Sequence, residues 1–228
     1  MVSAIWSMPP YEAGKMPINF FLKFFQNHGL FKLSKRPQWF TVKQRSRAYV
    51  NKVLSSISGE HYKNYKINSI KRIPSGVQIY YGGNNEFFDY DKVVLATHAN
   101  EALSLIKDPS EQEKNILSNF KYRENQAVLH TDENMMPKNR KTWSSWNSFV
   151  DPKDLNKSSL SYWLNLLQNL KTKKNIFLTL NPLKEISKDK ILKKINFTHP
   201  YYDQRALDNQ MNLKNIQNRE NILVCGSY

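Results

Sequence analysis

The chain has 228 residues, enough for one large domain or two small ones. Its 40% hydrophobic and 13% aromatic content excludes a disordered polypeptide and indicates a packed core. No apolar run reaches the roughly 18 residues of a membrane-spanning helix, and the first residues do not resemble a secretory signal. A single cysteine, Cys225, excludes an intramolecular disulfide, so we expect a cytoplasmic protein in which Cys225 is a small buried hydrophobe.

The formal charge of +15 admits two interpretations. One is a surface for nucleic acid or an anionic membrane. The other is a lysine-rich composition spread over solvated faces. The densest clusters, residues 171–174 and 191–194, are short, and no nucleic-acid-binding motif accompanies them. The sequence therefore favours solvated faces.

The first half of the chain alternates helices and strands. Phenylalanines between residues 20 and 25 recur at helical spacing, which predicts a helix over 17–28 that ends at Gly29. Its single lysine favours a core helix over a lipid-facing one. The other expected elements are a helix over 47–57, strands over 65–73, 77–81 and 92–96, and helices over 100–106 and 110–120.

Local signals mark two of these junctions. Pro74-Ser75-Gly76 predicts a hairpin between the first two strands. Ser110 with Glu113 predicts a capping box at the start of a helix.

The second half is richer in strands. They are expected over 126–131, 142–149, 161–167 and 175–180, followed by a helix over 202–213 and a short strand over 221–225. Since the last strand again belongs with the first half, the order predicts one domain interrupted by another.

No motif supplies a complete catalytic or metal-binding set. The five histidines are scattered, and HExxH, CxxC, GxSxG and GxGxxG patterns are absent from the sequence. His130 and Asp132 alternate at a strand end, where a surface loop is favoured over an oriented histidine. In TWSSWN (142–147), Trp143 and Trp146 would face opposite sides of a strand, and either a core strand or an aromatic pocket wall fits them.

Several ordered landmarks together carry a resemblance to a known family. They are RPQWFTVKQRSRAYVNKVL, GVQIYY, FDYDKVVLATHAN, AVLHTDENMMP, TWSSWN, SYWLNLLQNL, LTLNP, HPYYDQRALDNQ and ILVCGSY. The chain resembles the flavin-containing amine-oxidase-like FAD-dependent oxidoreductases, in particular the branch associated with cyclopropane-fatty-acid synthases. The similarity extends over essentially all 228 residues.

The resemblance implies a mixed α/β fold, in which a Rossmann-like FAD-binding domain is interrupted by a mostly antiparallel substrate domain. The implied segments are 1–40 (connecting helical segment of the substrate domain), 41–100 (FAD-binding), 101–205 (substrate domain) and 206–228 (return to the FAD-binding domain). The family's GxGxxG unit and glycine-rich tail have no counterpart here, so the chain is expected to be part of a longer flavoprotein and inactive alone. Gln44-Arg45-Ser46 stands where the family usually has Gly-Gly-Ser.

The resemblance also implies site residues. Those that would contact FAD are Ile67, Ala96, Thr97, Gly226 and Ser227. The candidate substrate-pocket residues are Trp143, Trp146, Tyr162 and Trp163. The implied reaction is hydride transfer from an organic substrate, fatty-acyl or lipid in class, to the flavin. No metal is expected, a peripheral membrane contact is compatible, and the alternative is a basic module that binds nucleic acid or anionic lipid without catalysis.

Overall fold

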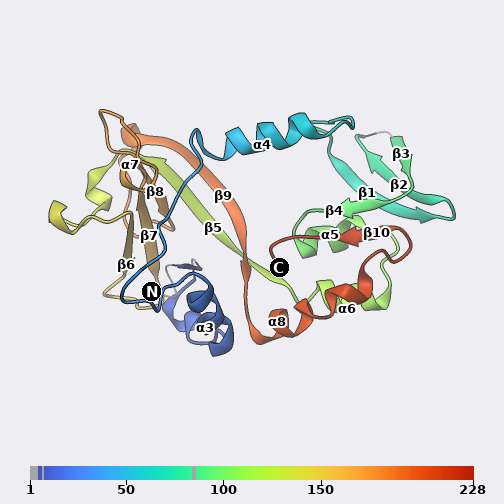
Figure 1. Cartoon of the computed structure of the whole chain (residues 1–228), viewed down its shortest axis with the longest axis horizontal. Coiled ribbons are helices and arrows are strands. Elements are labelled where there is room, and N and C mark those ends of the chain that lie inside the picture. The colour runs from blue at the N-terminus through green and yellow to red at the C-terminus, as the bar shows by residue number, and fades with distance from the viewer. Residues whose placement is uncertain (1–4, 7, 84–85) are drawn as a thin grey trace. The chain divides into compact units, whose positions relative to one another are not determined.

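The computed structural model describes residues 5–6, 8–83 and 86–228 (Figure 1). It divides into two compact units that interleave along the chain. The first unit comprises residues 1–31 and 122–199, and the second comprises residues 32–121 and 200–228. Each described helix is too short or too polar to cross a bilayer.

The first unit is built on a five-stranded sheet with the strand order β6-β7-β8-β5-β9. The strands are β5 (Lys121–His130), β6 (Trp146–Val150), β7 (Ser158–Trp163), β8 (Phe177–Leu180) and β9 (Ile191–Tyr201). The pairs β6–β7, β7–β8 and β8–β5 are antiparallel. The predicted antiparallel character of this half is confirmed along these three pairs.

Helices α2 (Pro10–Ala13) and α3 (Ile18–Asn27) precede this sheet in sequence, and α7 (Leu164–Leu167) follows β7. On α3, Phe24 lies edge-on against Trp6 with ring centroids 4.7 Å apart, and Phe25 is buried. Gly29 has a φ of 63°, a left-handed conformation that glycine adopts readily at a helix end. The predicted helix and its end are confirmed.

The second unit contains two small sheets. One is antiparallel, with β2 (Gly76–Tyr81) between β1 (Ile67–Ile73) and β3 (Glu86–Tyr90). Ile73 pairs with Gly76, so the predicted hairpin is confirmed. The other consists of β4 (Val93–Leu95) and β10 (Ile222–Val224), which run parallel.

The helices of the second unit are α4 (Arg45–Ser56), α5 (Ala99–Leu105), α6 (Glu111–Leu117) and α8 (Gln204–Gln210). The predicted capping box at α6 is confirmed, because Ser110 Oγ accepts from Glu113 N at 3.2 Å and Glu113 Oε2 accepts from Ser110 N at 2.8 Å. α5 contacts β1, and Lys107 N donates to Ile70 O at 2.9 Å.

Several expected boundaries are corrected. Residues 101–121, expected in the substrate segment, pack in the second unit because α5 and α6 contact each other and α5 contacts β1. The strand expected over 161–167 is β7 followed by the short helix α7, and β9 was not expected at all. Cys225, expected to be buried, is exposed.

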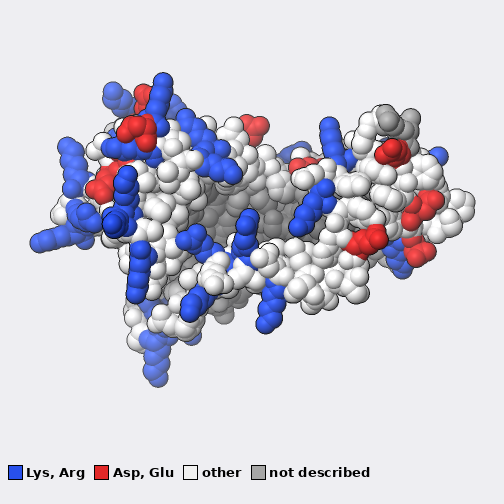
Figure 2. All heavy atoms as spheres, turned by 90° about the horizontal axis from the view of Figure 1, so that it is seen from above, with Lys and Arg blue, Asp and Glu red and all other residues white. Residues whose placement is uncertain are grey.

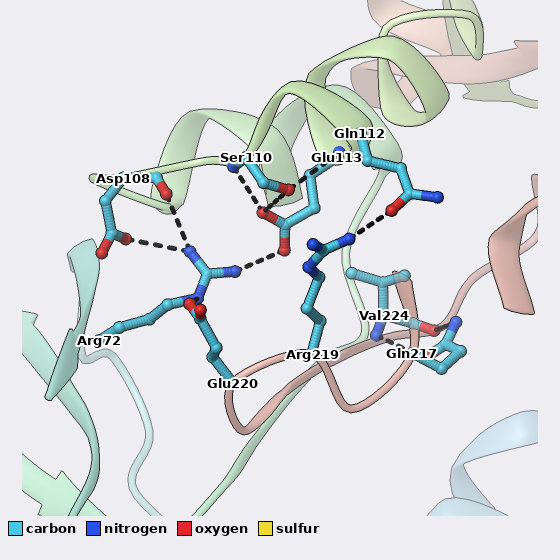
Figure 3. A network of polar contacts seen from close by, with 9 residues as sticks. All are labelled: Arg72, Asp108, Ser110, Gln112, Glu113, Gln217, Arg219, Glu220 and Val224. Carbon is cyan, nitrogen blue, oxygen red and sulfur yellow. Dashed lines mark hydrogen bonds and ion pairs between the residues drawn. The ribbon is translucent and has the colours of Figure 1, made fainter. Parts of the chain in front are cut away.

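A polar network centred on Arg72 connects β1 to α6 (Figure 3). The Arg72 guanidinium lies 2.5 Å from Glu113 Oε1, 3.1 Å from Asp108 Oδ1 and 3.0 Å from Glu220 Oε2. Glu113 is 2% exposed, and Arg72 is 9% exposed at its side chain. A buried carboxylate is tolerated when it is both paired and hydrogen-bonded, and Glu113 meets both conditions.

The same network reaches β10. Arg219, just before β10, donates to Gln112 of α6. The side-chain amide of Gln217 accepts from Val224 N at 3.1 Å and donates to Val224 O at 2.9 Å, as a neighbouring strand would (Figure 3). A side chain therefore satisfies one backbone N–H and C=O of β10 that the short sheet leaves without a strand partner.

The Arg72→Met variant should be strongly destabilised, because it leaves the buried Glu113 carboxylate without its counter-charge. We expect a loss of about 3–5 kcal/mol in the free energy of unfolding, measured by urea denaturation. The control is Glu220→Gln, which removes a carboxylate 71% exposed at its side chain and should cost roughly 1 kcal/mol or less. Equal effects of the two variants would contradict the assigned role of Glu113.

Candidate functional site

The carboxyl ends of β4 and β10 form the candidate site. Ile222, Leu223 and Val224 pair with Val93, Val94 and Leu95 in a parallel register. Cys225 N donates to Leu95 O at 2.9 Å, which continues the pairing past the strand ends. In parallel strands both carboxyl ends meet at one edge, where open α/β sheets bind their ligands.

This edge brings together four of the five residues predicted to contact a cofactor. Ala96 and Thr97 follow β4, and Gly226 and Ser227 follow β10. Thr97 is half-buried, whereas Ala96, Gly226 and Ser227 are exposed. The fifth, Ile67, lies in the other sheet, as the first residue of β1 opposite Tyr81. The structure thus gathers the four strand-end residues and places Ile67 apart from their sheet.

Gly226 lies closer to neighbouring atoms than any side chain would allow. A Cβ built there would lie 3.1 Å from Thr97 O and 2.7 Å from Cδ1 of Tyr228. Tyr228 is buried and packs on Phe120 with ring centroids 5.0 Å apart. The small residues and exposed backbone fit a ligand that approaches this edge closely, while the Tyr228 ring fills one side of Gly226.

A hydrogen bond from a residue just before α8 holds the segment that follows β10. Tyr202, two residues before α8, donates its hydroxyl to Ser227 O at 2.6 Å. Burial raises the pKa of Tyr202, so this hydroxyl keeps its proton at neutral pH and remains a donor. The bond fixes the Ser227 carbonyl, while the exposed Ser227 side chain stays available at the edge.

The departure from the family pattern at Gln44-Arg45 corresponds to an unusual backbone. Gln44 has φ 65° and Arg45 has φ 67°, both in the left-handed region. Glycine adopts this region freely, whereas other residues reach it at a cost of about 1 kcal/mol or more each. The backbone at these positions therefore has the conformation that two glycines would favour, but carries two long side chains.

The four candidate substrate-pocket residues separate into two clusters. Trp143 contacts Trp163 at 5.3 Å between ring centroids, and Trp146 contacts Tyr162 at 5.2 Å. Tyr162 and Trp163 are consecutive in β7, so their side chains point to opposite faces of the sheet. The four do not form a single wall.

The indole N–H groups of Trp143 and Trp163 already have partners. Trp143 Nε1 donates to Pro137 O at 2.8 Å, and Trp163 Nε1 donates to Asn175 Oδ1 at 3.0 Å. The strand expected over 142–149 begins at Trp146 because the Asn147 amide bonds both the N–H and the C=O of Ser144, which closes a turn.

A chain of buried polar groups crosses the same sheet. His130 is 0% exposed and Asp132 is 1% exposed, so the surface loop favoured by sequence was wrong. His130 Nε2 lies 2.7 Å from Thr179 Oγ1, which lies 2.8 Å from Ser161 Oγ. Thr179 and Ser161 each fall in a predicted strand, but a single small polar residue in a strand does not indicate such a contact.

The hydrogen bonds fix which nitrogen of His130 carries the proton. Asp132 N donates to His130 Nδ1 at 3.1 Å, so Nδ1 is the acceptor and Nε2 carries the hydrogen. His130 Nε2–H therefore donates to Thr179 and cannot accept a proton from the hydroxyl pair. This arrangement stabilises the core and does not activate Ser161 as a nucleophile.

Burial dominates the titration of His130 and lowers its pKa to about 4, despite the nearby Asp132 carboxylate. Burial alone would raise the pKa of Asp132, but its hydrogen bonds from Ser187 N, Asn134 N and Lys190 Nζ outweigh it and lower the pKa to about 2. At neutral pH the histidine is neutral and the aspartate is charged. Within the described part of the chain, no cluster of histidine, cysteine and carboxylate groups is arranged to hold a metal ion.

No family model and no curated protein matches this sequence. Solved structures do match. The chain overlays a protein assigned as a protoporphyrinogen oxidase from Exiguobacterium sp. 255-15 with a TM-score of 0.65 and 12% identity, over 99% of this chain and 56% of that one. It overlays a CLA-producing fatty acid isomerase from P. acnes with a TM-score of 0.55 and 12% identity, over 80% and 47% of the two chains.

A putrescine oxidase bound to putrescine matches with a TM-score of 0.51 and 9% identity, over 81% of this chain and 47% of that chain. The chain thus spans about half of the length of the structures it matches. At these identities the comparisons establish the fold alone: a mixed α/β architecture that this chain shares with the oxidase and isomerase structures. The predicted fold class is confirmed.

The Gly226→Ala variant should disturb the strand-end site. Its Cβ would push the Tyr228 ring away from Phe120 and crowd Thr97 O, and we expect a loss of about 1–3 kcal/mol in unfolding free energy. The matched control is Gly83→Ala, since nothing lies within 4 Å of a Cβ at Gly83. Urea denaturation of both variants measures the difference, and equal stability would show that the close approach at Gly226 imposes no constraint.

The lowered pKa of His130 predicts a fall in stability on mild acidification. Above pH 6.5 the residue is neutral in both states, and between pH 6.5 and 4 the unfolded chain binds a proton that the folded chain excludes. The contribution amounts to about 2 kcal/mol between pH 7 and 5. In the His130→Gln variant this part of the pH dependence should vanish in urea titrations, while His61→Gln, at an exposed site, should retain it. An unchanged slope in His130→Gln would contradict the assignment.

Proposed function

We propose that this chain is part of an FAD-dependent oxidoreductase that transfers hydride from an organic substrate to flavin. The observation that carries the proposal is the parallel β4–β10 edge, where Ala96, Thr97, Gly226 and Ser227 gather beside exposed backbone. An edge of small residues suits a dinucleotide, because the backbone can approach it closely. The amine-oxidase-like fold supports this choice of ligand.

In this proposal the second unit belongs to the FAD-binding domain, and a longer polypeptide supplies the turn that holds the pyrophosphate. Ala96 and Thr97 would lie along one side of the cofactor, and Gly226 and Ser227 along the other, with the Ser227 hydroxyl as a hydrogen-bonding group. The flavin accepts the hydride when bound. The chain's own residues exclude water and position the two reactants.

The first unit would carry the substrate. Each of its two aromatic clusters, Trp143 with Trp163 and Trp146 with Tyr162, offers an apolar face for a hydrophobic molecule. We propose a fatty-acyl or lipid substrate. One of the matched structures is a CLA-producing fatty acid isomerase, which supports this class.

The test is the visible absorption spectrum of the protein, expressed with the coding sequence that flanks this chain in its gene and then desalted. We expect the visible bands of a bound flavin. Ala96→Trp, which places a bulky ring at the carboxyl end of β4, should lower the flavin content at least tenfold. Lys92→Trp is the matched control, since it adds the same bulk at the exposed amino end of the strand.

A folded, colourless wild-type protein would overturn the proposed function. If the wild-type protein is yellow and Ala96→Trp leaves its flavin content unchanged, the protein binds flavin, but not at the β4–β10 edge.

A further inference from the structure

Residues 32–57, which include α4, expose apolar side chains along their whole length; we call them the basic apolar segment. Nothing in this segment is buried, and Leu33 and Phe40 are 94% and 88% exposed. The other large apolar residues that it exposes are Trp39, Val42, Tyr49, Val50, Val53 and Ile57. Single exposed apolar residues are common, but eight in one short segment mark an interaction surface.

The charge of this segment has one sign. It holds seven cations and no Asp or Glu, and in fact no acidic residue occurs anywhere between Glu12 and Glu60. The cations are Lys32, Lys35, Arg36, Lys43, Arg45, Arg47 and Lys52. Their side chains are exposed, and none of the ion pairs among the described residues engages them. The segment thus contributes seven positive charges in 26 residues to a chain whose net charge is +15.

The excess of cations is visible on the surface. In Figure 2 lysine and arginine side chains project over much of the face shown, and acidic side chains are fewer. All acidic residues of the second unit lie outside the segment in sequence, and Asp108 and Glu113, for example, are already engaged by Arg72. The basic apolar segment therefore has no acidic residue of its own.

Helix α4 arranges the two kinds of side chain in a definite order. At 3.6 residues per turn, Tyr49, Val53 and Val50 form one apolar stripe of the helix, and Ile57 follows directly after its last residue, Ser56. Arg45 and Lys52 lie along one border of that stripe, and Arg47 lies along the other. Long basic side chains at the borders of an apolar stripe can reach phosphate groups while the stripe enters the acyl region.

We propose that the basic apolar segment binds the surface of an anionic lipid bilayer. Lysine and arginine near a membrane are attracted by anionic headgroups, and Trp, Phe and aliphatic side chains insert at the boundary below them. A nucleic acid fits less well, since Leu33, Val42, Val50, Val53 and Ile57 cannot stack on bases as aromatic rings do. The segment lies flat on the bilayer, with its apolar side chains at the boundary between headgroups and acyl chains.

The test is flotation of the full chain with vesicles of phosphatidylcholine alone or of phosphatidylcholine with phosphatidylglycerol. The wild-type chain should float with the phosphatidylglycerol vesicles and not with the others. The variant Arg45→Gln, Arg47→Gln, Lys52→Gln should bind on the order of 100-fold more weakly, at about 1 kcal/mol for each cation. The variant Phe40→Ser, Val53→Ser should also lose binding, because the apolar contact contributes as well.

Matched controls remove the same groups elsewhere. Lys171→Gln, Lys173→Gln, Lys174→Gln deletes three exposed cations of the first unit, and Leu155→Ser, Met211→Ser deletes two exposed apolar side chains. Both controls should bind vesicles within a few-fold of wild type. Circular dichroism of each variant verifies that it is folded.

Four outcomes would overturn the proposal. The first is that the wild-type chain does not float with either kind of vesicle. The second is that the triple variant of the segment and the triple-lysine control lose vesicle binding equally. The third is that Phe40→Ser, Val53→Ser binds vesicles as the wild type does, while the chain binds single-stranded DNA tightly and in a salt-sensitive way. The fourth is binding lost when the flanking coding sequence is present, which would show that protein covers the segment. Flotation measures lipid binding, whereas the absorption spectrum measures bound flavin. A failure of this proposal can therefore be distinguished from a failure of the proposed function.

Discussion

The second unit depends on the pairing of β4 with β10, two three-residue strands from widely separated parts of the sequence. Two strands of this length cannot form a stable sheet alone. The surrounding side chains supply what the short ladder lacks: the Gln217 amide replaces a neighbouring strand at Val224, and the Arg72 network fixes α6 beside the segment that leads into β10. The position of the strand-end site is therefore set by polar side chains as much as by backbone pairing.

Two kinds of polar burial have different consequences in this protein. Around Arg72 the charges are buried and paired, so the network holds elements together. Around His130 the imidazole and the Thr179 and Ser161 hydroxyls are buried and neutral, and the bond that His130 Nδ1 accepts from Asp132 N makes Nε2 the donor to Thr179. A histidine, a serine and an aspartate close together would suggest catalysis, yet the proton on Nε2 gives them a structural part. The direction of the hydrogen bonds, and not the residue types, decides whether these residues are catalytic or structural.

Sequence reasoning located most elements because their signals are local. The phenylalanine spacing of α3, the hairpin at Pro74-Ser75-Gly76 and the capping box at Ser110 depend on neighbours within a few residues. It missed the 11-residue strand β9, because its lysines and asparagine and its few buried positions give no regular alternation of apolar and polar residues. It also missed the burial of His130 and Asp132, because their partners Thr179, Ser187 and Lys190 come from distant segments.

The candidate site was predicted in part for the same reason. A parallel pair brings the residues after each strand to one edge, so the gathering of Ala96, Thr97, Gly226 and Ser227 follows from the pairing itself. Ile67 was placed by family resemblance alone, and it lies in a different sheet. The close approach of Gly226 to Thr97 O depends on atoms from two strands, which no local pattern contains.

The interleaving of the two units has a consequence for synthesis. β4 leaves the ribosome well before β10, its partner, since residues 122–199 of the first unit are made in between. Until β10 emerges, Val93 and Leu95, which are buried in the folded unit, lack this strand partner. The first unit can complete its sheet up to β9 during this interval, whereas the second unit closes last, by a contact between distant residues that is slow to form. The nascent chain therefore carries an open strand edge while residues 122–199 of the first unit are made.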